Sequence, residues 1–204
     1  MVSTTTAHRV RAPRFPAPRG PLSMAVLARL RGDTAALDAA QIGPSPLEQV
    51  GPYGEDAQLA LYCCYELTYR GFAGVADELE WDPGLLGLRR QLEGAFLTAL
   101  QTDVPGGTDV AAEIDALLVE VVDAEGVSQH LRRAGQLWQL REYVVHRSLY
   151  HLKEADPQAW VIPRLAGPAK VALVTVEHDE YGSGNPDRIH AGLFADMMTN
   201  LGRR

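Results

Sequence analysis

The segment "VSQHLRRAGQLWQLREYVVHRSLYHLKE" (residues 127–154) decides the fold class that the sequence predicts. Placed at intervals of about 100° per residue, its apolar side chains form one stripe about a quarter-turn wide. The stripe consists of Val127, Leu131, Ala134, Trp138, Val145, Leu149 and Leu152. This period is typical of a helix that buries one face, so the pattern predicts one long amphipathic helix over 127–154.

Similar patterns lie on both sides of this segment. Their polar or proline-containing starts and their glycine or basic ends predict further helices over 23–30, 55–70, 82–100, 108–126, 168–182 and 185–202. The ambiguous stretch is "VALVTV" (171–176), because its β-branched residues also suit a buried strand. Several helices with short connections favour an all-α bundle.

One carboxylate borders the stripe of the long predicted helix. Glu142 lies at its edge, His146 sits beside it one helical step round, and His151 points to the opposite side, toward water. A carboxylate close to a core needs a partner, because burying it unpaired is very costly. The partner is either a cation from Arg141 or Lys153, or a metal ion.

The predicted helix over 168–182 repeats this anomaly. Glu180 falls in the centre of its apolar stripe, which consists of Ala169, Leu173 and Val176, and Glu177 lies at the edge. Two successive helices with glutamates on or beside their core faces strengthen the case for a shared metal site, because helical bundles build such sites from inward-facing carboxylates and histidines.

Composition sets the broad class. The chain has 204 residues, a net charge of −7, 46% hydrophobic and 22% charged residues, which is ordinary for a soluble globular protein. The negative charge argues against a nucleic-acid or anionic-membrane partner, and no apolar run reaches the length of a membrane span. The two cysteines, Cys63 and Cys64, are adjacent and predict buried thiols in a reducing cytoplasm.

The first residues differ from the rest. Residues 1–31 contain no acidic residue, and their arginines are Arg9, Arg11, Arg14, Arg19, Arg29 and Arg31. Prolines from Pro13 to Pro21 oppose regular structure there. We therefore expect a disordered, basic, proline-rich tail over 1–22 and one helical domain over 23–204.

Three blocks resemble a known family. "YELTYRGFAGVADELEWDP" (65–83), "HRSLYHLKEADPQAW" (146–160) and "DEYGSGNPDRIHAGLF" (179–194) are similar to blocks of the iron-containing redox enzyme family, the haem-oxygenase-like iron oxidases and oxygenases. The resemblance spans roughly residues 45–202. It implies a haem-oxygenase-like helical bundle without haem, one or two non-haem irons, and O2-dependent oxidation of a small organic substrate.

The resemblance also implies a set of metal ligands. In this family a Glu and a His come from one core helix, a Glu from the next, and a His-x3-acid-x2-His set from a later helix. Glu142 and His146 match the first pair in type, and Glu180 matches the next glutamate, with Glu177 as the alternative. The later set is missing here, because no histidine follows His190.

This departure leads us to expect a bundle that is incomplete at its C-terminus and that self-associates through an uncovered helical face. Three functions remain open on the sequence alone. The first is an O2-dependent iron oxidoreductase, which we expect to bind iron weakly and to be inactive as this short chain. The second is a non-catalytic helical binding module, and the third is a fragment that has lost the metal site.

Overall fold

The computed structural model describes residues 12–39, 50–104, 106–119 and 126–202. Every regular element in these ranges is a helix and none is a strand, so the predicted all-α class is confirmed. The "VALVTV" stretch is helical. Contacts divide the chain into two compact units, Met1–Glu113 and Ile114–Arg204. None of the described helices is long and apolar enough to cross a membrane.

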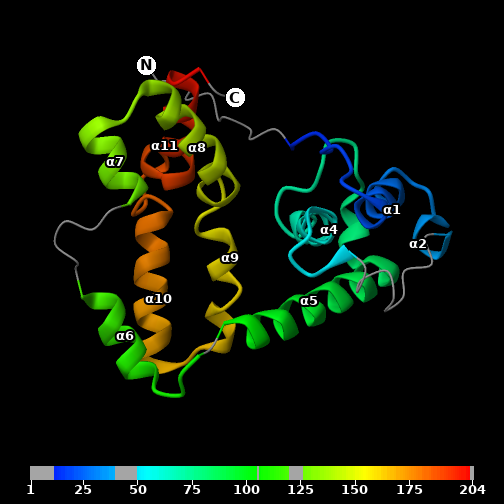
Figure 1. The fold of residues 1–204 in the computed structure, drawn as a ribbon, viewed down its shortest axis with the longest axis horizontal. Coiled ribbons are helices and arrows are strands. Elements are labelled where there is room, and N and C mark those ends of the chain that lie inside the picture. Colours follow the sequence, from blue (N-terminus) through cyan, green and yellow to red (C-terminus); the bar gives the residue numbers. More distant parts are fainter. Residues whose placement is uncertain (1–11, 40–49, 105, 120–125, 203–204) are drawn as a thin grey trace. The chain divides into compact units, whose positions relative to one another are not determined.

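The first unit is built on α1 (Pro21–Leu30), α4 (Glu55–Glu66) and α5 (Pro83–Asp103), with the shorter α2 (Ala36–Ala39) and the 3₁₀ helix η1 (Asp77–Trp81) beside them (Figure 1). The predicted start of α5 is confirmed, because the Asp82 carboxylate accepts a hydrogen bond from the Leu85 N–H at 2.9 Å and Pro83 occupies the first turn.

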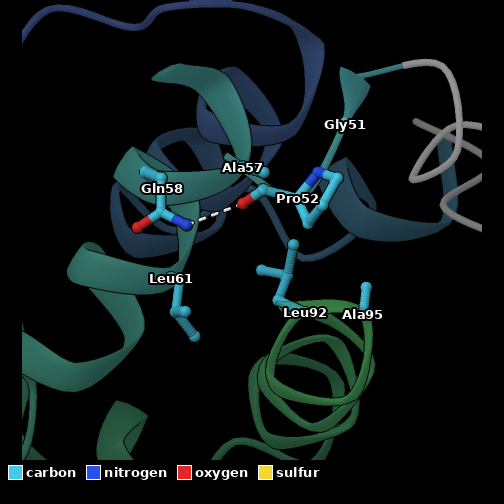
Figure 2. Close-up of a pocket in the computed structure, with 7 residues that line it drawn as sticks. All are labelled: Gly51, Pro52, Ala57, Gln58, Leu61, Leu92 and Ala95. Atoms are coloured by element: carbon cyan, nitrogen blue, oxygen red, sulfur yellow. Dashed lines mark hydrogen bonds between the residues drawn. The ribbon is translucent and has the colours of Figure 1, made fainter. Parts of the chain in front are cut away.

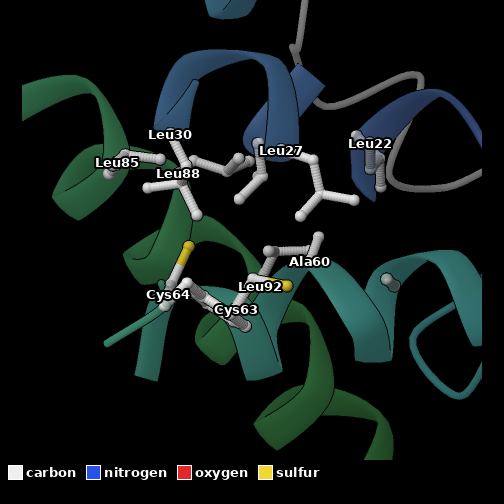
Figure 3. Packing of buried hydrophobic residues seen from close by; sticks show 12 residues of the cluster. Leu22, Leu27, Leu30, Ala60, Cys63, Cys64, Leu85, Leu88 and Leu92 are labelled. Carbon is white, nitrogen blue, oxygen red and sulfur yellow. The ribbon is translucent and has the colours of Figure 1, made fainter. Parts of the chain in front are cut away.

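One apolar cluster holds these helices together (Figure 3). Its buried members include Leu22, Val26, Leu27 and Leu30 of α1, Ala57, Ala60, Cys63 and Cys64 of α4, and Leu85, Leu88 and Leu92 of α5. Burial raises the pKa of each cysteine thiol to about 12, so both are neutral and unreactive at neutral pH. The cysteines are therefore packing residues, as the sequence predicts.

A buried carboxylate joins α4 to the beginning of α1. Asp56 accepts hydrogen bonds from the backbone N–H groups of Leu22 (2.9 Å) and Ser23 (2.7 Å) and from the Ser23 hydroxyl. These N–H groups belong to the first turn of a helix and have no partner within it. A Cβ on Gly20 would stand 2.5 Å from Asp56 Oδ2, so this approach requires a glycine.

The segment before α1 differs from the expected disordered tail over its described part. The Phe15 ring stacks on the Phe72 ring with centroids 5.2 Å apart. The Arg31 guanidinium also lies over the Phe15 ring, 4.7 Å from its centroid. The Ala73 N–H donates to the carbonyl of Pro13 at 2.9 Å. Extended proline-rich chain loses little conformational entropy on ordering, so these few contacts are enough to hold it. Residues 1–11 lie outside the described ranges.

Over its described residues, the second unit contains five α-helices and two 3₁₀ helices that follow one another after the boundary. They are α7 (Val127–Ala134), α8 (Leu137–His151), α9 (Asp156–Ala159), η2 (Ile162–Arg164), α10 (Gly167–Glu180), η3 (Pro186–Arg188) and α11 (His190–Asn200). The helix α6 (Val110–Leu118) crosses the boundary itself. The predicted helix over 168–182 is confirmed as α10.

The prediction of one long helix over 127–154 is wrong. Gly135 has an extended backbone (ψ 141°) that ends α7, and Gln136 begins α8, where its N–H donates to Gln139 Oε1 at 2.8 Å. The stripe therefore changes phase at the break. Within α8 the buried residue is Val144, whereas Val145 is exposed.

The helices α8 and α11 pack against each other in the second unit. Arg141 Nε donates to the carbonyl of Leu201 at 2.9 Å and so satisfies an acceptor at the end of α11. The His151 ring of α8 contacts the Phe194 ring of α11 with centroids 4.8 Å apart. The first contact joins the beginning of α8 to the end of α11, and the second joins the end of α8 to the first turns of α11, so the two helices pack antiparallel.

Candidate metal centre

The small pocket of the first unit is not a candidate active site. It lies where residues from Gly51 to Leu61 face α5, and its lining residues are Gly51, Pro52, Ala57, Gln58, Leu61, Leu92 and Ala95 (Figure 2). The one polar side chain among them, Gln58, already donates to the carbonyl of Pro52 at 2.7 Å. The lining offers no acid, base or nucleophile.

The second unit brings together three side chains that are typical metal ligands. Glu154 lies in the turn after α8, Glu180 is the last residue of α10, and His190 is the first residue of α11. One ligand atom from each lies within 4.8 Å of the other two. His190 Nδ1 and Glu180 Oε2 are 2.6 Å apart, and all three residues are half-buried.

The connection between α10 and α11 explains how Glu180 meets His190. Three successive residues adopt left-handed backbone conformations, Gly182 (φ 82°), Ser183 (φ 51°) and Gly184 (φ 84°). The Ser183 N–H donates to the carbonyl of His178 at 2.8 Å, which closes the end of α10. The "YGSG" sequence therefore forms a tight turn directly after α10, and the chain that follows it places His190 beside Glu180.

A hydrogen-bonded histidine orients Glu154. The Arg147 Nε–H donates to His151 Nε2 at 3.1 Å, so this nitrogen acts as the acceptor and the ring proton of neutral His151 is on Nδ1. His151 Nδ1 lies 3.2 Å from Glu154 Oε2. The sequence-based expectation that His151 points to water is wrong, since its side chain is only 21% exposed.

Further acidic groups adjoin Glu180. Glu177, one turn earlier on α10, is 4% exposed, and its Oε2 has no hydrogen-bond partner. Burial, followed by the charges of Glu180 and Asp156, raises the pKa of Glu177. The Tyr181 hydroxyl donates to Asp156 Oδ1 at 3.0 Å, and burial together with this bond raises the pKa of Tyr181 to about 12.

The structure places only one of the three sequence-predicted ligands in this group. Glu180 is there, but Glu142 and His146 contact each other on α8 at 3.3 Å, with side chains 59% and 75% exposed. The physical reason is the helix break at Gly135, because the stripe drawn through both helices gave α8 the wrong rotational phase. Arg141, considered as a partner for Glu142, instead binds the end of α11.

Sequence reasoning missed Glu154 and His190. Glu154 follows the end of α8, where helical periodicity carries no information. His190 lies ten positions after Glu180, and only the glycine-rich turn between them indicates that the chain returns. Both residues stand inside the blocks that carry the family resemblance.

The three side chains fit a metal ion. Bonds from carboxylate oxygen or imidazole nitrogen to an ion such as Zn²⁺ are about 2.0–2.2 Å, so two donors on one ion lie at most about 4.4 Å apart. The three ligand atoms lie within 4.8 Å of one another, so any pair farther apart than about 4.4 Å needs only a small side-chain movement to share one ion. Glu180 Oε2 is covered and, apart from its ion-pair contact with His190 Nδ1, has no hydrogen-bond partner, so it is free to bind a cation.

The second unit is helical over its described residues and brings two carboxylates and one histidine together as possible metal ligands. Residues 141–204 match the family model of the iron-containing redox enzymes, which confirms the predicted family for this segment. The match includes Glu154, Glu180 and His190. No curated protein and no solved structure matches the chain. The description of that family, iron-containing redox enzymes, applies to the matched residues 141–204, about a third of the chain.

Proposed function

We propose that this protein is a non-haem iron oxidoreductase that uses O2 to oxidise a small organic substrate. The observation that carries the proposal is the meeting of Glu154, Glu180 and His190 inside the segment that matches the iron-containing family. Two carboxylates and one imidazole are hard-to-borderline donors of the kind that suit iron(II) with open positions for other molecules.

The donor set favours a bare ion over haem. Haem iron takes its protein ligands along one axis, commonly a single histidine, and the porphyrin supplies the other positions. Here three side chains from three separate segments converge within 4.8 Å, which suits direct coordination by the protein. The number of ions, one or two, depends on how many further ligands join this group.

The side chains have separable roles in this proposal. Glu154, Glu180 and His190 would hold the iron, and His151 would keep Glu154 turned toward the other two. Bound iron(II) supplies a site at which O2 is activated for oxidation. The acidic neighbours Glu177 and Asp156 add negative charge, which favours a cation at this end of α10.

Metal binding by the purified chain tests the proposal directly. Iron(II) is titrated anaerobically against the wild type and against Glu154→Gln, Glu180→Gln and His190→Ala. We expect each substitution to weaken binding strongly, because each removes one of three ligands. The matched control is Glu142→Gln with His146→Gln on the exposed face of α8, which we expect to bind as the wild type does.

The alternative is a non-catalytic helical module or a fragment that has lost its metal. That alternative gains support if the folded wild type takes up no iron, or if the ligand variants and the α8 control behave alike. Iron uptake without O2 consumption in the presence of candidate substrates would retain the metal site and reject the oxidase activity.

The cellular location and the binding partners belong to the same proposal. We place the protein in the cytoplasm, since its two cysteines are free, buried thiols. Its partners are O2 and a small-molecule substrate. The net charge of −7 opposes binding to nucleic acid or to an anionic membrane.

A further inference from the structure

Glu177 is the most buried charged residue of the second unit among the described residues. Its side chain is 4% exposed, and Oε2 is fully covered with no hydrogen-bond partner. Burying a carboxylate in this state is costly, and native proteins rarely leave such a group without a function or a bound ion. Glu177 is the one buried residue of α10, whereas the adjacent Val176 is 56% exposed, so the buried position of this helix carries an acid and not an apolar side chain.

Two other carboxylates act on Glu177. Glu180 follows it by three positions on α10, so the two Cβ atoms are about 5–6 Å apart on one helix face. Besides burial, the groups that act on Glu177 are Glu180 and Asp156, and both are acidic. Bringing acids together inside a protein is unfavourable unless a cation or a proton is shared among them.

We propose that Glu177 is a fourth ligand of the metal centre, and that its carboxylate joins Glu154, Glu180 and His190 when the cation binds. This inference rests on the proposed function. A cation at Glu180 lies one helical turn from Glu177, within the reach of a glutamate side chain that rotates about its χ angles. The centre then has three carboxylates and one imidazole, and α10 supplies two of these ligands.

A role as the fourth ligand would account for an acid at a position where it costs stability in the metal-free protein. A glutamine at this position would remove the buried charge and the repulsion from Glu180, so stability alone favours its replacement. A ligand residue is kept despite that cost. The inference therefore predicts opposite effects of one substitution on the metal-free fold and on metal binding.

Cobalt(II) titration of the full chain, followed by visible absorption and by competition with a chelator, tests this inference. We expect Glu177→Gln to unfold at the same or a higher temperature than the wild type without metal, yet to bind Co²⁺ about 10- to 100-fold more weakly. Its absorption spectrum should also change, because the coordination sphere loses an oxygen.

A charge-preserving variant separates ligation from the general negative field. Glu177→Asp keeps the charge but shortens the side chain, so we expect it to weaken Co²⁺ binding as well. Asp179→Asn removes an exposed carboxylate from the same helix and should leave the affinity within about 3-fold of the wild type.

The possible outcomes separate this inference from the proposed function. Wild-type affinity and spectrum in Glu177→Asp, whatever Glu177→Gln does, would show that Glu177 contributes charge alone and overturn its role as a ligand while the metal centre stands. Failure of the wild type to take up Co²⁺ or iron(II) would overturn the proposed function and this inference together.

Discussion

His151 connects the end of α8 to the metal-ligand group, with Nδ1 3.2 Å from Glu154 Oε2 and Nε2 accepting from Arg147. Its ring is held between Tyr150 (5.2 Å between centroids) and Phe194 of α11 (4.8 Å). His190 begins α11 one turn before Phe194, so the helix that contacts the His151 ring also carries a ligand on the same face. His151 is therefore a positioning residue for Glu154.

Replacing His151 should weaken metal binding without removing a ligand. His151→Leu loses the group facing Glu154, and we expect about 10-fold weaker Co²⁺ binding in chelator competition, at the low end of the effect of orienting residues. His151→Asn places an amide donor near the position of Nδ1 and should recover most of the affinity. His146→Leu, at an exposed histidine on the same helix, is the control. Equal affinities in the Leu variant and the wild type would rule out the positioning role.

The fold class could be predicted because the signals that start and end helices depend on residues close together in the sequence. Asp82 and Pro83 begin α5 through contacts within four residues, and "YGSG" ends α10 through its left-handed backbone conformations. The long helix over 127–154 could not be predicted correctly by the same reasoning. A glycine is tolerated inside many helices, so Gly135 in the sequence does not by itself mark the break that its ψ of 141° makes after α7.

The metal-ligand group was only partly predictable for a related reason. Periodicity singled out Glu180 through the stripe of Ala169, Leu173 and Val176, although Val176 is exposed and the buried residue of α10 is Glu177. Glu154 lies in a turn, and His190 is the first residue of its helix, so neither has a periodic signal. Their meeting depends on the path of the chain between helices, which a single sequence does not determine.

The buried carboxylate of Asp56 should contribute strongly to the stability of the first unit. Asp56→Ala leaves two backbone N–H groups and the Ser23 hydroxyl without their acceptor, and we expect a loss of about 3 kcal/mol in the free energy of unfolding. The neighbouring Glu55→Ala removes only the exposed ion pair with Arg19 and should cost less than about 1 kcal/mol. Urea unfolding followed by circular dichroism measures both, and similar losses would contradict the assigned role of Asp56.

The Arg29–Asp82 ion pair should make the first unit sensitive to acid. Burial acts to raise the pKa of Asp82, but hydrogen bonds from the Arg29 guanidinium and the Leu85 N–H hold that pKa below its ordinary value. A carboxylate with a lowered folded-state pKa stabilises the fold above its unfolded pKa of about 3.9, and this stabilisation is lost as the pH falls through the folded value. We expect the wild type to lose this contribution below about pH 4.

Two substitutions separate the charge from the helix cap. Asp82→Asn retains an N-cap oxygen but not the charge, so its stability deficit at neutral pH should narrow toward zero as the wild-type carboxylate becomes protonated. Asp82→Ala also loses the cap and should keep a deficit of about 1 kcal/mol at low pH. Thermal unfolding over a pH series measures both. A pH-independent deficit in Asp82→Asn would show that the ion pair does not stabilise the fold.

Gly182 should be essential for bringing His190 to Glu180, and Gly184 provides a matched comparison. Both have left-handed backbones, at φ 82° and 84°, so alanine at either should cost about 1–2 kcal/mol in stability. A Cβ at Gly184 meets nothing within 4 Å, whereas one at Gly182 would stand 2.3 Å from the carbonyl oxygen of Asn185 and 2.9 Å from the backbone of Arg188 and Ile189.

The clash at Gly182 falls on the segment that leads directly into His190. Backbone atoms cannot move aside as a flexible side chain can, so Gly182→Ala should displace the start of α11 and separate His190 from Glu180. We expect Gly182→Ala to lose more stability than Gly184→Ala and to weaken Co²⁺ binding at least about 10-fold, while Gly184→Ala, once folded, binds nearly as the wild type does. Equal Co²⁺ affinities in the two folded variants would show that the close approach at Gly182 does not determine the geometry of the metal centre.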